Sequence, residues 1–192
     1  MPTRNLFAHP VQVDQLKAEG FSFDLVAGPD ERAVIAHRLD LAGLSRLAAK
    51  GRVAPLPHGL VEVEGAFEAD LSQRCVVTLD PFEAEVALPF RRLFTTLPET
   101  DAPLGEIVVD DATDEPEPVE AGMIDLGEVV VEELSLGLDP YPRGPGADEA
   151  LRRHGILSEE EAEAKAAADA RAAGPFAALA ALRGKGGRSG ES

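Results

Sequence analysis

Apolar and polar residues alternate most regularly between residues 61 and 90. In the first part of this stretch acidic residues stand between apolar ones. The apolar positions are Val61, Val63, Phe67, Ala69 and Leu71, and the acidic ones are Glu62, Glu64, Glu68 and Asp70. Because successive side chains of a strand point to opposite faces, this period of two predicts a strand with one buried and one wet side. A similar run from Phe82 to Phe90 follows Asp80-Pro81, which marks a turn. Two such strands joined by a short connection predict an antiparallel sheet.

Two further stretches fit the same sheet. Residues 21–27 alternate as a strand does, and Cys75, Val77 and Leu79 continue the alternation of the strand before them. The pattern therefore predicts which side chains are buried and which are exposed. We expect burial of Val61, Val63, Phe67, Cys75, Val77, Val86 and Leu88, and exposure of Glu62, Glu64 and Glu83.

Two helices are predicted between these strands. Gly28-Pro29-Asp30 ends the first strand and caps a helix that begins near Glu31. A second helix is expected from Asp40, as its N-cap, to Gly51. Its support is one stripe of apolar residues at helical spacing, formed by Leu41, Leu44 and Leu47.

A third helix is predicted after Asp125, with Glu128 three residues later as a capping-box partner. Leu126, Val130 and Leu134 share one face of it, and Pro140 and Pro142 lie beyond its end. Farther along the chain, Ser158 is predicted to cap a helix rich in Glu and Ala that runs to about Ala172.

Together these elements predict an α+β fold, with an antiparallel sheet, three packed helices and a C-terminal helical extension. The α+β domain is expected over residues 1–143, and the linker and helical extension over 144–183. Residues 184–192, rich in Gly and Ser, are expected to be disordered. Within the domain, residues 98–121 are acidic and proline-rich and contain no Lys or Arg. We expect a mobile loop there, with a short strand only at residues 107–109.

The charge of the chain narrows the classes of partner. Its 192 residues contain 35 acidic and 18 basic side chains, for a net charge of −17. Proteins that bind nucleic acid use Lys and Arg to displace counterions from phosphates, so such a chain is repelled on average by RNA and by anionic membranes. It is attracted to basic proteins. The same charge is also explained by solubility alone.

The search for catalytic chemistry finds no recognisable motif. The four histidines (His9, His37, His58 and His154) are scattered along the sequence without metal-ligand spacing. Cys75, the only cysteine, is interpreted as a small buried apolar residue, and the alternative is a reactive thiolate. We therefore expect no catalytic residues, no metal and no cofactor. The single cysteine and the lack of an apolar run long enough to cross a bilayer favour a cytoplasmic protein.

Four segments, in order, resemble the motifs of a known family. They are Gln73–Pro81, Ile124–Leu136, Asp139–Arg143 and Pro175–Leu179. This ordered set resembles the YceD family, named for accumulation of large-subunit ribosomal RNA. The resemblance implies a role in maturation or stability of that RNA, without known catalysis. Relatives with additional cysteines are linked to metal and nucleic-acid binding. Here Cys75 stands alone, so no zinc site is expected.

The leading hypothesis is therefore a non-enzymatic accessory factor of ribosome assembly that associates with a basic ribosomal protein or a pre-ribosomal particle. Its candidate contacts are acidic residues and an apolar C-terminal stripe, namely Asp110, Asp111, Asp114, Glu115, Glu128, Glu132, Phe176, Leu179 and Leu182. The C-terminal stripe has a second interpretation, in which it docks back on the sheet. The alternative function is direct binding of structured RNA through a patch at Arg91 and Arg92. The least supported alternative is a metal-dependent hydrolase that uses loop carboxylates.

Overall fold

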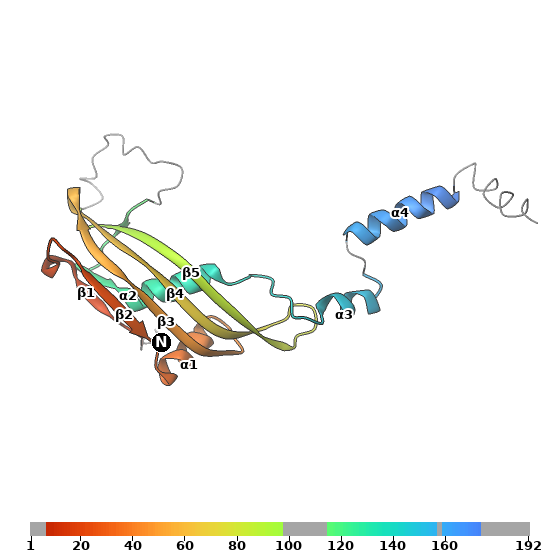
Figure 1. Cartoon of the computed structure of the whole chain (residues 1–192), viewed down its shortest axis with the longest axis horizontal. Helices are drawn as coiled ribbons and strands as arrows, with labels where there is room; N and C mark the ends of the chain where they lie inside the picture. Colours follow the sequence, from red (N-terminus) through yellow and green to blue (C-terminus); the bar gives the residue numbers. More distant parts are fainter. Residues whose placement is uncertain (1–6, 98–114, 157–158, 174–192) are drawn as a thin grey trace, which may run out of the picture. The chain divides into compact units, whose positions relative to one another are not determined.

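The computed structural model describes residues 7–97, 115–156 and 159–173. The chain divides into two compact units, Met1–Gly144 and Pro145–Ser192. The first unit contains a five-stranded sheet in the order β2-β3-β4-β5-β6 and a separate pair, β1-β7 (Figure 1). The strands are β1 (Pro10–Gln12), β2 (Phe21–Val26), β3 (Gly43–Leu56), β4 (Leu60–Arg74), β5 (Pro81–Thr95), β6 (Glu117–Pro118) and β7 (Met123–Asp125).

Every strand pair is antiparallel except β5 with β6, which is parallel. Two α-helices belong to this unit, α1 (Pro29–Arg38) and α2 (Leu126–Gly137), together with the 3₁₀ turns η1 (Val13–Gln15) and η2 (Pro57–Gly59). The second unit contains α3 (Ala147–Arg153) and α4 (Glu159–Ala173). The α+β architecture and the antiparallel sheet predicted from the sequence are confirmed. No helix among the described residues has the length and apolar character needed to cross a bilayer.

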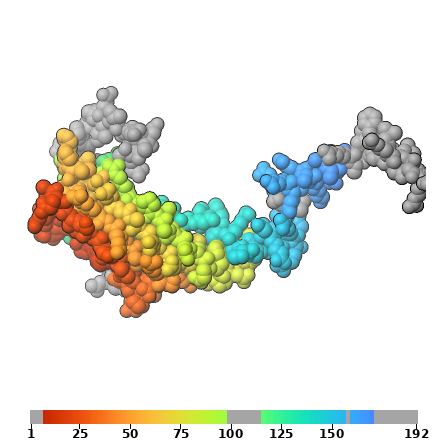
Figure 2. Space-filling view, in the orientation of Figure 1, coloured from red at the N-terminus to blue at the C-terminus, as the bar shows by residue number. Residues whose placement is uncertain are grey.

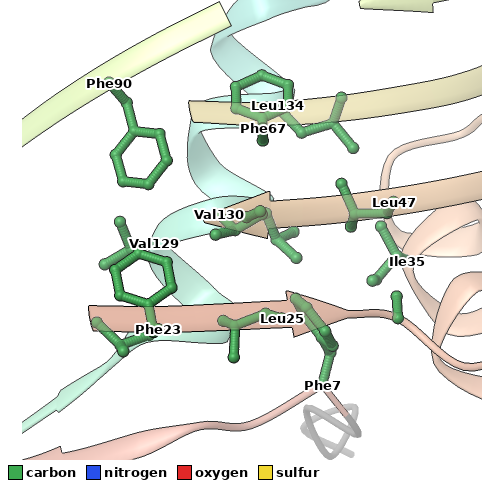
Figure 3. Packing of buried hydrophobic residues seen from close by; sticks show 14 of the residues in the cluster. Phe7, Phe23, Leu25, Ile35, Leu47, Phe67, Phe90, Val129, Val130 and Leu134 are labelled. Carbon is green, nitrogen blue, oxygen red and sulfur yellow. The ribbon is translucent and has the colours of Figure 1, made fainter. Parts of the chain in front are cut away.

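The core lies between one face of the sheet and the two helices of the first unit. Figure 3 shows Phe67 of β4 and Leu47 of β3 facing Val130 and Leu134 of α2, with Ile35 of α1 beside them. These five side chains are buried. Burying them removes apolar surface from water, the main favourable term in folding, so this face fixes the position of both helices.

The N-cap of α2 also holds the start of the described chain. One carboxylate oxygen of Asp125 accepts hydrogen bonds from the backbone N–H groups of Gly127 (3.0 Å) and Glu128 (3.3 Å), as predicted for an N-cap. The same oxygen accepts a hydrogen bond from the backbone N–H of His9 at 2.8 Å. One side chain therefore starts the helix and fixes the N-terminal segment against it.

The helix predicted from Asp40 to Gly51 is wrong, because residues 43–56 form strand β3. A register shift, or β-bulge, lies between Leu44 and Arg46 in the pairing with β4. The extra residue of a bulge brings side chains three apart onto the same face, so Leu44 and Leu47 are both buried although both lie in a strand. Their helical spacing is therefore a consequence of the bulge.

Burial predictions for the sheet are largely confirmed. Val61, Val63, Phe67 and Cys75 are buried, while Glu64 and Glu83 are exposed and Glu62 is half-buried. The prediction is wrong for Leu88, which is 42% exposed, and too strong for Val77 and Val86, which are half-buried. The strand expected to continue through residues 75–79 is a turn.

Several predictions concern residues outside the described ranges. These include the loop over 98–114 with its expected strand at 107–109, Ser158, the tail, and the candidate contacts Asp110, Asp111, Asp114, Phe176, Leu179 and Leu182. The Glu- and Ala-rich helix is present as α4, and the sequence did not predict α3. Strand β6 lies at residues 117–118, within the stretch for which a strand was expected only at 107–109. It pairs with Phe94 and Thr95 at the end of β5.

Candidate functional site at the turn between β4 and β5

The turn between β4 and β5 is closed by backbone hydrogen bonds around Cys75. The N–H of Cys75 donates to the carbonyl of Asp80 at 2.9 Å, and the N–H of Leu79 donates to the carbonyl of Cys75 at 2.8 Å. The sulfur of Cys75 accepts a hydrogen bond from the N–H of Thr78 at 3.5 Å. Cys75 is thus the anchor of the turn, which agrees with its interpretation as a buried residue.

Hydrogen bonding also sets the acidity of this thiol. Bonds from Thr78, through its side chain and then its backbone, outweigh burial and lower the pKa of Cys75 to about 7. A thiol in such a position is partly ionised near neutral pH. The side chain is only 1% exposed, however, so it is poorly accessible to a substrate.

Leu79 occupies an unusual position in this turn. Its φ angle of 65° lies in the left-handed region, which costs an L-residue with a Cβ roughly 1–2 kcal/mol. Its side chain is 71% exposed, so burial of this leucine does not offset that cost. Val76, on the other side of the turn, is also exposed. The turn therefore holds two apolar side chains in contact with water.

A second segment, Leu138–Gly144, packs against the turn. The N–H of Val76 donates to the carbonyl of Pro142 at 2.9 Å, and the side-chain amide of Gln73 donates to the carbonyl of Asp139 at 3.4 Å. A Cβ atom added at Gly144 would lie 3.1 Å from the ring of Phe82 and 3.5 Å from the Cβ of Cys75, so the backbone approaches closely here. Two segments that are far apart in the sequence therefore form one surface.

A pocket of about 430 Å³ lies at this junction. Its walls come from the turn, from the residues after α1 and from the end of α2, and they include Leu41, Cys75, Val76, Leu79, Leu138 and Pro142. Asp40, Asp139 and Arg74 supply its charged groups. Tyr141, beside the pocket, is 74% exposed. We name the turn Cys75–Asp80 together with Leu138–Gly144 the junction surface.

The pocket at the junction surface has few ionisable groups. Its ionisable groups are carboxylates, one arginine and a buried thiol, and no histidine lines the pocket to act as a base for that thiol. Across the described ranges, no three His, Cys, Asp or Glu side chains are grouped so that they could hold a metal ion.

The two predicted acidic contacts on α2 have partners within the protein. Glu128 forms an ion pair with Arg38 of α1, in which the Nη1 to Oε2 distance is 2.8 Å. Glu132 forms an ion pair with Arg92 at 3.1 Å. Glu115, the remaining described candidate, is exposed. Glu128 and Glu132 thus join α2 to α1 and to β5.

The two adjacent arginines predicted for RNA binding lie on opposite faces of β5. Arg91 faces the wet side and pairs with Glu62 at 2.6 Å. Arg92 faces α2, where it makes a bidentate contact with Glu117 (2.6 and 2.5 Å) and further ion pairs with Glu132 and Glu133. Its side chain is 14% exposed. Burial acts to lower the pKa of Arg92, but Glu117 and the two α2 carboxylates overcome this effect and raise it.

Sequence reasoning singled out Gln73–Pro81 and Asp139–Arg143 as separate motifs but did not predict that they meet in one surface. The signal available was the run Asp139-Pro-Tyr-Pro142, in which a tyrosine lies between two prolines. Asp139 accepts a hydrogen bond from the N–H of Tyr141 at 2.8 Å, which fixes the local turn.

These features describe an α+β protein in which two distant segments meet around a pocket. The chain matches the family model described as large ribosomal RNA subunit accumulation protein YceD over residues 63–183. Since the match covers more than half of the chain and includes both segments of the junction surface, the chain belongs to the YceD family. The comparison with curated proteins produced no match, and the comparison with solved structures produced none either.

Proposed function

We propose that this protein is a non-enzymatic cytoplasmic factor for accumulation of large-subunit ribosomal RNA, and that it acts by binding a basic ribosomal protein. Membership in a family named for this RNA supports the general role. The choice of a basic partner rests on which charged side chains of the sheet form ion pairs. Arg46, Lys50 and Arg91 each pair with a carboxylate, and Arg92 pairs with three. By contrast, exposed Glu64, Glu83 and Glu85 form no ion pair with a described residue, and among the arginines of the sheet this holds only for Arg52 and Arg74.

Direct RNA binding is the second candidate, and one observation favours it at a different place from the predicted one. Arg143 belongs to the junction surface and Arg74 lines its pocket. Both are exposed, and neither forms an ion pair with a residue that the structure describes. Exposed Tyr141 is of the type that stacks on bases. These residues replace Arg91 and Arg92 as the candidate RNA contacts.

Affinity purification with and without RNase distinguishes the two candidates. If the partner is a basic protein, it remains bound after RNase treatment. Replacing Asp110, Asp111, Asp114 and Glu115 by Ser then weakens its capture, whereas replacing Arg74 and Arg143 by Gln does not. Direct RNA binding predicts the opposite result for both variants. Removal of negative charge strengthens association with phosphates, and removal of arginines weakens it. Capture that is abolished by RNase and increased by the Ser variant rejects the proposed partner.

A further inference from the structure

Among the described residues, no strand pairs with the outer edge of the sheet along most of β5. This strand pairs with β4 from Pro81 to Thr95, whereas its other side pairs with β6 only at Phe94 and Thr95. From residue 81 to residue 93, no described strand lies on that side. Figures 1 and 2 show β5, in yellow-green, at the margin of the strands. Such an edge presents unpaired N–H and C=O groups and is a template for an added strand.

Prolines limit how much of this edge is usable. Pro81 and Pro89 have no N–H group, so neither can donate to a new neighbour. Residues 82–88 lie between them without a proline. The edge is therefore suited to a short extended segment of about the same length.

The two faces of this stretch differ in character. Ala84, Val86 and Leu88 stand opposite buried residues of β4 (Leu71, Ala69 and Phe67), so they lie on the core side of the sheet. They are incompletely covered, and Leu88 is 42% exposed. Glu83 and Glu85 lie on the opposite, wet face. A strand added here would meet apolar side chains on one face and carboxylates on the other.

The carboxylates indicate the charge of the occupant. Within the part of the chain that the structure describes, Glu83 and Glu85 form no ion pair, and Glu85 stands directly opposite another acidic residue, Asp70. Like charges in this position destabilise a sheet, and an opposite charge on a neighbouring strand stabilises it. The other margin of the sheet differs, because on β2 the carboxylate of Asp24 pairs with Lys50 at 3.0 Å.

We infer that residues 82–88 of β5 bind an extended segment of a partner protein in which Lys or Arg alternates with apolar residues. The inference rests on the proposed function, since it gives the chemistry of the basic partner and its place of contact. A second copy of this chain is a poorer occupant, because pairing two β5 edges with their apolar sides together places glutamates beside glutamates.

The test uses the full chain and a labelled probe peptide, Lys-Val-Lys-Val-Lys-Val-Lys, with fluorescence anisotropy as the readout. Charge reversal at the edge, Glu83→Lys with Glu85→Lys, should weaken binding of this peptide about tenfold, because two favourable cross-strand pairs become repulsive. The same variant should gain binding of the matched peptide that has Glu in place of Lys. The control Glu159→Lys with Glu160→Lys changes the net charge equally on α4 and should bind the Lys peptide as the natural chain does.

A second probe tests the backbone contact. N-methylation of alternate residues of the Lys peptide preserves its charge but removes the N–H groups that would pair with β5. The methylated peptide should therefore not bind. Equal binding of the methylated and unmethylated peptides would show electrostatic attraction without strand addition and would overturn the inference. Sedimentation of the natural chain as a dimer that the peptide disperses would assign the edge to a second copy and would overturn it too.

Failure of this inference is distinguishable from failure of the proposed function. If a basic ribosomal protein is captured with RNase present but the peptide-binding tests fail, only the assignment of the binding site to the edge of β5 is wrong. If the peptide-binding tests give the expected results and no ribosomal protein is captured, the edge of β5 remains the binding site but its partner is not a ribosomal protein.

Discussion

Arg91 and Arg92 show how one position in a strand changes the role of a residue. They are adjacent in sequence and identical in chemistry, yet Arg91 lies half in water beside a single glutamate and Arg92 lies under α2 among three. Arg92 also places its guanidinium 5.9 Å from the centre of the Phe94 ring. The period of two in a strand separates their environments.

The two arginines should therefore differ in their effect on stability. Arg92→Gln leaves three carboxylates of a partly buried cluster without their cation, which should reduce the free energy of unfolding by about 2–4 kcal/mol. Arg91→Gln removes a single ion pair whose arginine is 55% exposed, and should cost about 1 kcal/mol. Urea denaturation of both variants measures the difference. Equal effects would mean that the cluster under α2 contributes no more than a surface ion pair.

The thiol of Cys75 should titrate near neutral pH. Thr78 lowers its pKa to about 7, so thiolate absorbance in the ultraviolet should rise with a midpoint near that value. Thr78→Val removes the side-chain hydrogen bond and should move the midpoint up toward roughly 8.5, the usual value for cysteine. A midpoint above the usual value in the natural chain would show that burial dominates over hydrogen bonding.

The same shift has a consequence for stability. An acid whose pKa is lowered by folding stabilises the protein above its ordinary pKa, and this contribution disappears as the pH falls through the folded value. Stability linked to Cys75 should therefore decrease as the pH is lowered through about 7. Comparison with Cys75→Ala, which has no thiol to titrate, isolates this contribution in urea denaturation at several pH values.

At the scale of elements, alternation predicted β2, β4 and β5 because their core faces keep a strict period of two. It failed in β3, where the bulge brings Leu44 and Leu47 to one face, and local spacing cannot distinguish this from a helix turn. The N-cap at Asp125 was predictable because capping is local. The junction surface was not, because it depends on contacts between Val76 and Pro142 that no local pattern encodes.

The left-handed residue of the turn provides a test that separates stability from binding. Leu79→Gly relieves the strain of a positive φ angle but adds entropy to the unfolded chain, so the net change should be a gain of at most about 1 kcal/mol. The same change removes the exposed apolar side chain. If the junction surface contacts the partner, capture in the affinity purification should fall while stability is unchanged or higher. If the variant still captures the partner, Leu79 does not contact it. If the variant is less stable, the side chain of Leu79 supports the turn.

For the whole molecule, the dominant property is a net charge of −17. Charges at the rim of an interface act mainly on the rate of encounter, and their effect is screened by salt. The acidic sequence over residues 98–121 and the glutamates at the edge of β5, Glu83 and Glu85, are separate groups of carboxylates that could attract a basic protein. Long-range attraction and local strand addition should therefore affect different rate constants.

The association and dissociation rates of binding to the captured ribosomal protein should separate long-range attraction from local strand addition. Raising the salt concentration from about 50 mM to about 300 mM shortens the screening distance, so the association rate should fall at least tenfold while the dissociation rate changes less. Replacing Asp110, Asp111, Asp114 and Glu115 by Ser should lower the association rate at low salt and reduce its dependence on salt, without changing the stability of the fold. The edge variant, Glu83→Lys with Glu85→Lys, should in addition raise the dissociation rate, because the groups it changes remain in contact after binding. Surface plasmon resonance measures both rates. A salt effect confined to dissociation, or an association rate that rises when the loop acids are removed, would contradict attraction between this acidic protein and a basic partner.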